Sequence, residues 1–184
     1  MSEELIIKHC SPTLAGIKTG SLFSVRMTKD TDINKEVREL NDMLRKKGLR
    51  MIPLRIKGEN ALIYLFRPDH LKKDLNDPNA KRILKRKGYK SEKPEYCIVQ
   101  LIGHLNNDDT FPHEIGLFLG YPPLDVECFM DHPCEGVKCC GCWKAFSEPE
   151  KARKIFEKYK ICTDTYHKRY KNGKSLAQLA VTTG

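Results

Sequence analysis

The residues best suited to chemistry lie in two short segments that are far apart in the sequence. His9 and Cys10 are adjacent near the N-terminus, and His113 and Glu114 follow a proline in the second half of the chain. A thiolate is both a nucleophile and a metal ligand, and a neighbouring imidazolium lowers the pKa of a thiol below its free value of about 8.5. If the fold brings the two segments together, Cys10 is predicted to act as a nucleophile or redox thiol, or Cys10, His9 and His113 to hold a metal ion. The alternative is that Cys10 is a small buried apolar residue and His9 is its hydrogen-bonded neighbour.

A group of sulfur and imidazole side chains follows the second segment, in a stretch that also contains the single tryptophan. The group consists of Cys128, His132, Cys134, Cys139, Cys140 and Cys142. Its spacing does not match a zinc knuckle, which needs two pairs of cysteines with a short gap inside each pair. The zinc protease pattern H-E-x-x-H is also excluded, because position 117 is Leu. The sequence therefore predicts no metal ligands within this group, and it identifies no cofactor.

Length and composition favour one soluble domain over residues 1–184. The chain has 184 residues, of which 40% are hydrophobic, and no obvious linker divides it. No segment reaches the roughly 18 uninterrupted apolar residues that a membrane span needs, and no export signal is evident. Eight cysteines in such a chain are expected to be reduced thiols rather than disulfides. We therefore expect a cytoplasmic protein that does not enter a membrane.

Strands and helices must position these residues, and the spacing of apolar residues along the chain is typical of strands in some segments and of helices in others. Strands are expected within Ser21 to Val25, Met51 to Lys57, Ala61 to Phe66 and Trp143 to Phe146. Together they predict an α+β fold, in which one small mixed or antiparallel sheet of about four strands packs against several helices.

Cap residues mark where the helices begin. We expect starts after Asp32, at Pro78, at Pro94, after Pro112 and near Leu124, and a final long helix after Ser147, whose spacing to Glu150 is that of a capping box. The segment that contains His9, Cys10, Pro12 and Gly16 is expected to be a loop or a short, broken helix, because proline lacks a backbone donor and glycine loosens the chain.

The basic residues favour an anionic ligand in general but identify none. The formal charge is +9, and the densest basic run lies between Lys81 and Lys90. No aromatic stacking platform is interleaved with that run and no nucleic-acid motif surrounds it. We therefore interpret it as a solvated helix face and expect nucleic acid to be an unlikely partner.

Three blocks of the chain resemble a known family. His9 to Phe23, Phe111 to Val126 and Gly141 to Phe146 are similar to the signature blocks of domain-of-unknown-function family 3793, which comprises small uncharacterised proteins of anaerobic bacteria. The third block departs from the family pattern at Cys142, where an aromatic residue is usual, and at its end, where Val-Tyr is usual in place of Ala145-Phe146. These departures weaken a role for Cys142. The resemblance supplies no activity. It implies only that the blocks matter together, so that His9, Cys10, Lys18, His113, Glu114 and Cys140 are expected to converge.

Two function classes remain open, and the sequence does not decide whether the protein is an enzyme. In the first, Cys10, His9 and His113 are the candidate catalytic residues, and Lys18, Glu114 and Cys140 contribute to a site for a small anionic ligand or a metal ion. In the second, the protein is a non-catalytic binding or adaptor module whose basic surface engages an acidic protein or nucleic acid. The oligomeric state is not predicted.

Overall fold

The computed structural model describes residues 1–28, 30–107 and 110–182, and the chain divides into two compact units. The first unit is Met1–Asp69 together with Ile161–Gly184, and the second is His70–Lys160. Both units contain helices and strands, so the predicted mixture of the two is confirmed. The prediction of one domain stays a prediction. Within the described ranges no helix is both long enough and apolar enough to cross a membrane.

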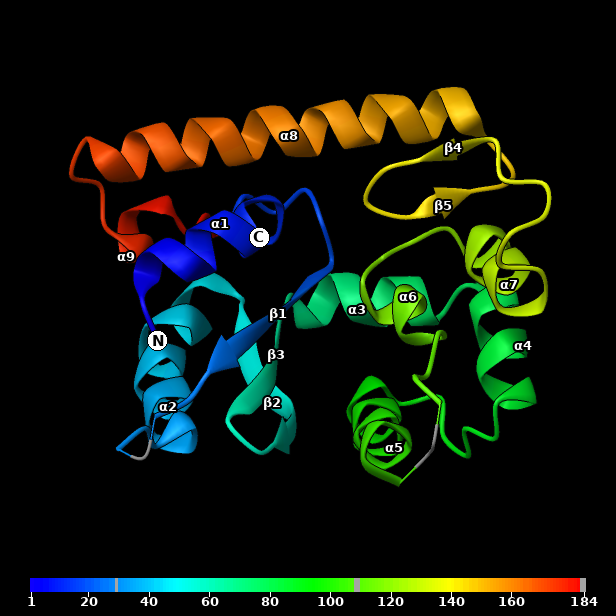
Figure 1. Cartoon of the computed structure of the whole chain (residues 1–184), viewed down its shortest axis with the longest axis horizontal. Helices are drawn as coiled ribbons and strands as arrows, with labels where there is room; N and C mark the ends of the chain where they lie inside the picture. Colours follow the sequence, from blue (N-terminus) through cyan, green and yellow to red (C-terminus); the bar gives the residue numbers. More distant parts are fainter. Residues whose placement is uncertain (29, 108–109, 183–184) are drawn as a thin grey trace. The chain divides into compact units, whose positions relative to one another are not determined.

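The first unit is built on a three-stranded antiparallel sheet (Figure 1). Its strands are β1 (Gly20–Arg26), β2 (Arg50–Lys57) and β3 (Asn60–Phe66), in the order β1-β3-β2. Gly58 has a φ of 56°, which lets the chain turn tightly between β2 and β3. All three strands lie where the sequence predicts them. The central strand β3 is buried along most of its length, as its apolar residues on both faces predict.

The predicted sheet of about four strands is wrong, because the fourth strand belongs to a separate two-stranded ribbon in the second unit. That ribbon pairs β4 (Cys139–Cys140) with β5 (Lys144–Ala145). The extended segment at Trp143 to Phe146 is correctly predicted, but its partner is a local one. A two-residue pairing has no alternating period that the sequence could reveal.

The helices of the first unit are α1 (Glu3–Leu14), α2 (Ile33–Leu44), the short 3-10 helix η1 (Arg45–Lys47), the C-terminal part of α8 (Pro149–Lys171) and α9 (Leu176–Leu179). Of these, α1 and α2 contact the sheet, and α9 contacts α1. The predicted cap at Asp32 is confirmed, since its side chain accepts from the backbone N–H of Lys35 at 3.0 Å. Gly48, with a left-handed φ of 70°, caps the C-terminal end of η1.

The expected loop or short, broken helix around His9 and Cys10 is wrong. These residues belong to α1, a regular helix that begins at Glu3, after the N-cap Ser2, and has Pro12 inside its last turn. A proline so close to the helix end removes little of the hydrogen bonding. Burial of an apolar stripe that includes Ile6 and Leu14 stabilises the helix in spite of it.

The core of the first unit lies between α1, α2 and the sheet. It consists of Ile6, Ile7, Cys10, Leu14, Phe23, Val25, Ile33, Val37, Leu44, Leu49, Met51, Ala61, Ile63, Leu65, Tyr166, Leu176, Leu179 and Ala180. Beside it, the buried guanidinium of Arg67 donates to the carbonyls of Thr13, Leu14 and Val181, each at 2.8 Å. One side chain thus satisfies the C-terminal end of α1 and the last segment of the chain.

The second unit is mainly helical. Its elements are most of α3 (Pro68–Leu75), α4 (Pro78–Arg86), α5 (Pro94–Asn107), α6 (Ile115–Phe118), α7 (Pro123–Asp131), the ribbon β4-β5 and the N-terminal part of α8. The starts predicted at Pro78 and Pro94 are confirmed, and the Asp77 carboxylate caps α4. The helix α7 contacts both α6 and the ribbon strand β5, and these neighbouring elements carry the site.

Candidate ligand-binding site

A cavity of about 400 Å³ lies between α6, α7 and the ribbon of the second unit. We call it the aromatic pocket. Its lining consists of His113, Ile115, Gly116, Leu119, Tyr121, Asp125, Val126, Phe129, Cys140, Gly141, Cys142, Trp143 and Lys144. Most of these side chains are apolar and a few are polar, which is the usual composition of a pocket for a small molecule.

The floor of the pocket is formed by close packing of α6 on α7. A Cβ added at Gly116 would lie 2.8 Å from Cγ2 of Val126, so glycine is needed for this approach. Gly120 has a φ of 76°, and the backbone N–H of Tyr121 then donates to the carbonyl of Gly116 at 3.0 Å. The two glycines therefore turn the chain sharply enough to place Tyr121 beside the pocket.

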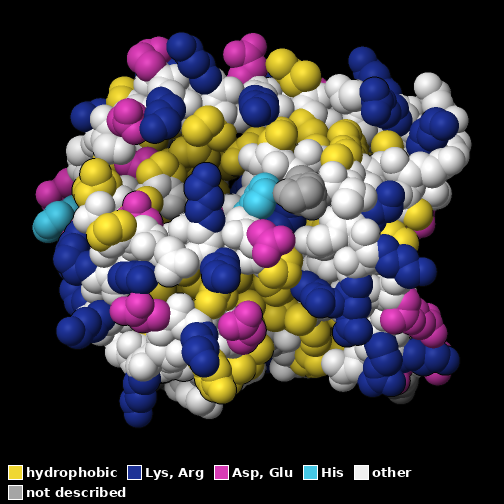
Figure 2. All heavy atoms as spheres, turned by 180° about the vertical axis from the view of Figure 1, so that it is seen from behind, with side chains coloured by type: hydrophobic (Ala, Val, Ile, Leu, Met, Phe, Trp, Pro, Cys, Tyr) yellow, Lys and Arg dark blue, Asp and Glu magenta, His cyan; other side chains and the backbone are white. Residues whose placement is uncertain are grey.

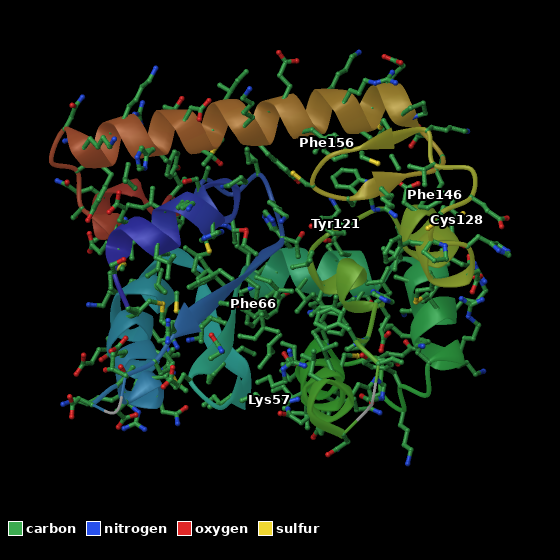
Figure 3. The ribbon with its side chains drawn as sticks, in the orientation of Figure 1. Lys57, Phe66, Tyr121, Cys128, Phe146 and Phe156 are labelled. Atoms are coloured by element: carbon green, nitrogen blue, oxygen red, sulfur yellow. The ribbon has the colours of Figure 1, made fainter. Side chains whose placement is uncertain are left out.

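One wall is a stack of three aromatic rings from different elements. The Trp143 ring stacks on the Tyr121 ring with centroids 5.1 Å apart. It also meets the ring of Phe156, in α8, edge to face, with centroids 4.5 Å apart. A Cβ on Gly141 would lie 2.3 Å from Cδ2 of Phe156, so the ribbon lies directly against this ring (Figure 3). Offset and edge-to-face ring pairs are stabilising, so the wall is well ordered.

Asp125 of α7 fixes this wall. Oδ2 accepts from the indole N–H of Trp143 at 2.8 Å, and Oδ1 accepts from the backbone N–H groups of Phe146 and Ser147 at 3.0 and 2.9 Å. The Ser147 hydroxyl also donates to Oδ1, at 2.8 Å. The Ser147 hydroxyl, which is expected from the sequence to take part in a capping box with Glu150, thus donates to Asp125.

Asp125 is ionised at neutral pH in spite of its burial. Burial alone raises the pKa of this carboxyl, but hydrogen bonds from Phe146, Trp143 and Ser147 outweigh it and hold the pKa below the ordinary value. The negative charge is thus balanced by fixed donors inside the unit.

The mouth of the pocket carries its cationic and thiol groups. The exposed ring of His113 meets Phe129 edge to face at 5.0 Å. Lys144 lies with its ammonium 5.4 Å from the centre of the Phe129 ring and donates to a backbone carbonyl at 2.8 Å. Cys140 and Cys142 are exposed at the same edge. The pocket therefore has an apolar interior and a polar mouth.

The predicted site residues fall into different units. His113, Glu114 and Cys140 belong to the second unit, where His113 and Cys140 both line the aromatic pocket. Glu114 does not line that pocket, but it lines a second cavity, to which His113 also contributes. His9, Cys10 and Lys18 belong to the first unit, and the convergence of the two sets stays a prediction.

The environment of Cys10 does not favour a thiolate. The side chain is completely buried, and burial raises the pKa of the thiol, although nearby Lys18 and a hydrogen bond with Ser21 oppose the effect. The expected lowering of this pKa is therefore wrong. His9 is exposed and stacks on Phe23, with ring centroids 6.0 Å apart. The role of Cys10 as a nucleophile stays a prediction.

The cysteine group forms no metal centre among residues 1–28, 30–107 and 110–182. Nowhere in those ranges do three or more His, Cys, Asp or Glu side chains gather closely enough to hold an ion. None of the eight cysteines, all of which lie in the described ranges, forms a disulfide.

The basic run on α4 is largely ion-paired. Arg82 donates from both terminal nitrogens to the carboxylate of Glu127 at 2.6 Å, and Arg86 bonds likewise to Asp131 at 3.1 and 3.2 Å. Lys81 pairs with Glu92 at 2.8 Å. On the face shown in Figure 2, Lys and Arg side chains are dispersed and interleaved with acidic ones. Weak binding of nucleic acid stays a prediction, as does the adaptor role.

Sequence reasoning missed three residues that shape the pocket. Tyr121, Asp125 and Trp143 are not among the predicted site residues, although all three lie in the blocks that resemble the family. The one available signal was the single tryptophan beside a cluster of glycine and cysteine. Asp125 has the sequence signature of an ordinary acidic residue in the first helical turn.

Comparison with known proteins identifies a family. A family model described as "Protein of unknown function (DUF3793)" matches residues 6–180, which is nearly the whole chain. The search of curated proteins and the search of solved structures each give no significant match.

Proposed function

We propose a function from the site itself, because the chain belongs to the DUF3793 family of proteins of unknown function and the family description supplies no activity. The proposed function is non-covalent binding of a small apolar molecule that carries one acidic group, in the aromatic pocket of the second unit. The observation that supports it is the concave aromatic and aliphatic lining with cationic groups at the mouth.

The apolar part of the ligand would lie against the floor and the aromatic wall. Leu119 and Val126 offer aliphatic surface, and Trp143 offers a ring face beside Tyr121. Contact with these groups removes apolar area from water, which contributes roughly 25 cal/mol for each Å² buried. A molecule with one small ring is the size that a cavity of about 400 Å³ accepts.

The acidic group would lie at the mouth, beside Lys144 and His113. Asp125 is the acidic residue of the lining, and its charge is already balanced by hydrogen bonds from Trp143 and Ser147. It therefore repels a second carboxylate less than an unpaired carboxylate would. Lys144 supplies an ammonium beside Phe129, whose ring His113 also contacts. This arrangement favours an anion at the mouth over one in the interior.

The fluorescence of Trp143 tests the proposal, because this is the single tryptophan of the chain and it lines the pocket. The probe is cyclohexanecarboxylate, which is transparent where indole absorbs, and its neutral counterpart is cyclohexanecarboxamide. We expect a saturable change with the carboxylate and weaker binding of the carboxamide. Lys144→Met should remove that difference, whereas Lys158→Met, the same charge loss at an exposed position on α8, should not.

Two results would contradict the proposal in different ways. If neither probe changes the Trp143 signal in a saturable manner, the aromatic pocket does not bind such molecules. If the carboxamide binds as tightly as the carboxylate, the pocket takes apolar molecules but the mouth does not select an acid.

A further inference from the structure

Glu114 is fully buried, and one of its carboxylate oxygens lacks a hydrogen-bond partner within the described residues. Oε1 lies 3.0 Å from Nδ1 of His104 and 3.3 Å from the hydroxyl of Tyr89. Oε2 has no hydrogen bond to any described residue. The ammonium of Lys87 lies 4.0 Å from Oε2, which is too long for a hydrogen bond. A buried carboxylate oxygen is costly without a donor, so its presence points to a bound group that supplies one.

The packing around Glu114 brings both of its hydrogen-bond partners to Oε1 and none of the described donors to Oε2. Glu114 directly precedes α6, and Tyr89 is buried, with its ring edge to face on His104 at 5.0 Å. Both donors therefore come from packed side chains and meet the same oxygen. Oε2 is left as the acceptor on the other side of the group.

Glu114 lines a second cavity, of about 720 Å³, which shares His113 and Phe129 with the aromatic pocket. We call it the Glu114 cavity. Its polar lining includes Arg86, Lys87, His104 and His113, and its apolar lining includes Phe111, Phe129 and Met130. The volume accepts a molecule of amino-acid size, and the two phenylalanine rings offer it an apolar surface.

The charged side chains around the cavity favour a ligand that carries an acidic group as well as a hydrogen-bond donor. The Arg86 guanidinium is already engaged by Asp131 at 3.1 Å and by Glu127 at 3.4 Å. Lys87 is different, because its side chain is 43% exposed and the carboxylate it faces is still 4.0 Å away. With His113 it provides cationic or donor groups for one ligand carboxylate. The chemistry that suits the cavity is therefore an N–H donor next to an acid.

We propose that the Glu114 cavity binds a zwitterionic α-amino acid with an apolar side chain. The ammonium group donates to Oε2 of Glu114, and the carboxylate pairs with Lys87 and His113. The side chain packs against Phe111 and Phe129. This site does not rest on the function proposed for the aromatic pocket, and it takes a different class of ligand.

Calorimetric titration with three matched probes tests the assignment. L-phenylalanine carries both charged groups, hydrocinnamate lacks the ammonium, and phenethylamine lacks the carboxylate. We expect L-phenylalanine to bind about tenfold more tightly than either analogue, since each lost charge-assisted hydrogen bond is worth about that factor.

Glu114→Gln separates the role of the carboxylate from that of the cavity shape. It should weaken L-phenylalanine and phenethylamine by about tenfold and leave hydrocinnamate unchanged. Glu135→Gln, the same change at an exposed position of the second unit, should alter none of the three. Lys87→Met should give the complementary pattern by weakening L-phenylalanine and hydrocinnamate but not phenethylamine. Because Lys87 is partly exposed, this variant keeps the test decisive if Glu114→Gln fails to fold.

Hydrocinnamate also belongs to the class of apolar acids proposed for the aromatic pocket, and binding there would change the Trp143 fluorescence. The Glu114 proposal is therefore overturned if hydrocinnamate binds as tightly as L-phenylalanine without a change in that fluorescence, or if Glu114→Gln leaves the affinity for L-phenylalanine unchanged. Absence of heat with all three probes overturns it as well. The Trp143 signal thus separates the failure of one proposal from the failure of the other.

Discussion

Trp143 donates its indole N–H to Asp125 at 2.8 Å, and this bond joins the ribbon to α7. The other carboxylate oxygen of Asp125 accepts from Phe146 and Ser147, at the point where the ribbon ends and the chain leads into α8. Three elements of the second unit are thus tied to one buried side chain. The shape of the aromatic pocket depends on this arrangement more than on any single apolar contact.

Asp125→Asn is expected to destabilise the protein by about 3 kcal/mol, because the amide has the size of the carboxylate but loses its charge and turns an N–H toward one of the donors. Unfolding in urea measures the loss. Asp164→Asn, at an exposed position of α8, should change the free energy of unfolding by less than about 0.5 kcal/mol. Equal stability of the two variants would show that Asp125 does not fix the wall.

The stabilisation by Asp125 is expected to depend on pH. Its hydrogen bonds leave the folded-state pKa below the ordinary value of 3.8, although burial acts in the opposite direction. A lowered pKa contributes stability that is complete above pH 3.8 and is lost as the pH falls through the folded-state value. The stability difference between the native protein and Asp125→Asn should therefore be largest near neutrality and shrink in acid. Urea titrations at several pH values measure it, and a difference that grows in acid would refute the assignment.

The eight thiols are expected to differ sharply in reactivity. Cys134, Cys140 and Cys142 are exposed, whereas Cys10 is completely buried and burial raises its pKa. Alkylation of the native protein with iodoacetamide, followed by identification of the modified residues by mass, should label the exposed three first. Cys10 should react only after denaturation. Preferential labelling of Cys10 in the native protein would restore its predicted role as a nucleophile.

Two glycines of the second unit offer a matched pair of substitutions. Gly116→Ala places a Cβ 2.8 Å from Val126, and overpacking of this kind costs about 1–3 kcal/mol. Gly103→Ala in α5 meets nothing within 4 Å, so the higher helix propensity of alanine should stabilise the protein by up to about 1 kcal/mol. Thermal unfolding of both variants measures the effects. Opposite signs are predicted, and a harmless Gly116→Ala would mean that α6 and α7 are not closely packed.

Sequence patterns predict the local elements well because their causes are local. The cap at Asp32, the proline at the start of α4 and the central strand β3 all follow from a few neighbouring residues. The helix α1 is the instructive failure. Its proline and glycine signals favour irregular backbone, but burial of one face against the first unit's core outweighs them.

The site was less predictable because it depends on contacts between distant residues. His113 and Cys140 were identified and both line the aromatic pocket. The link between Asp125 and Trp143 spans 18 positions and has no periodic signature. Glu114 was identified as well, but its fully buried carboxylate and its pairing with His104 could be seen only in the structure.

The indole N–H signal of Trp143 in a proton–nitrogen correlation spectrum tests the central claim most directly. The chain has one tryptophan, so this signal is unique, and its hydrogen bond to Asp125 lies at the wall of the aromatic pocket. On titration with cyclohexanecarboxylate, we predict that it moves to saturation together with the amide signals of Gly116 and Gly141, while the amide signal of Phe23 in the first unit stays in place. An indole signal that does not move, or that moves only in proportion to shifts across both units, would contradict binding in this pocket.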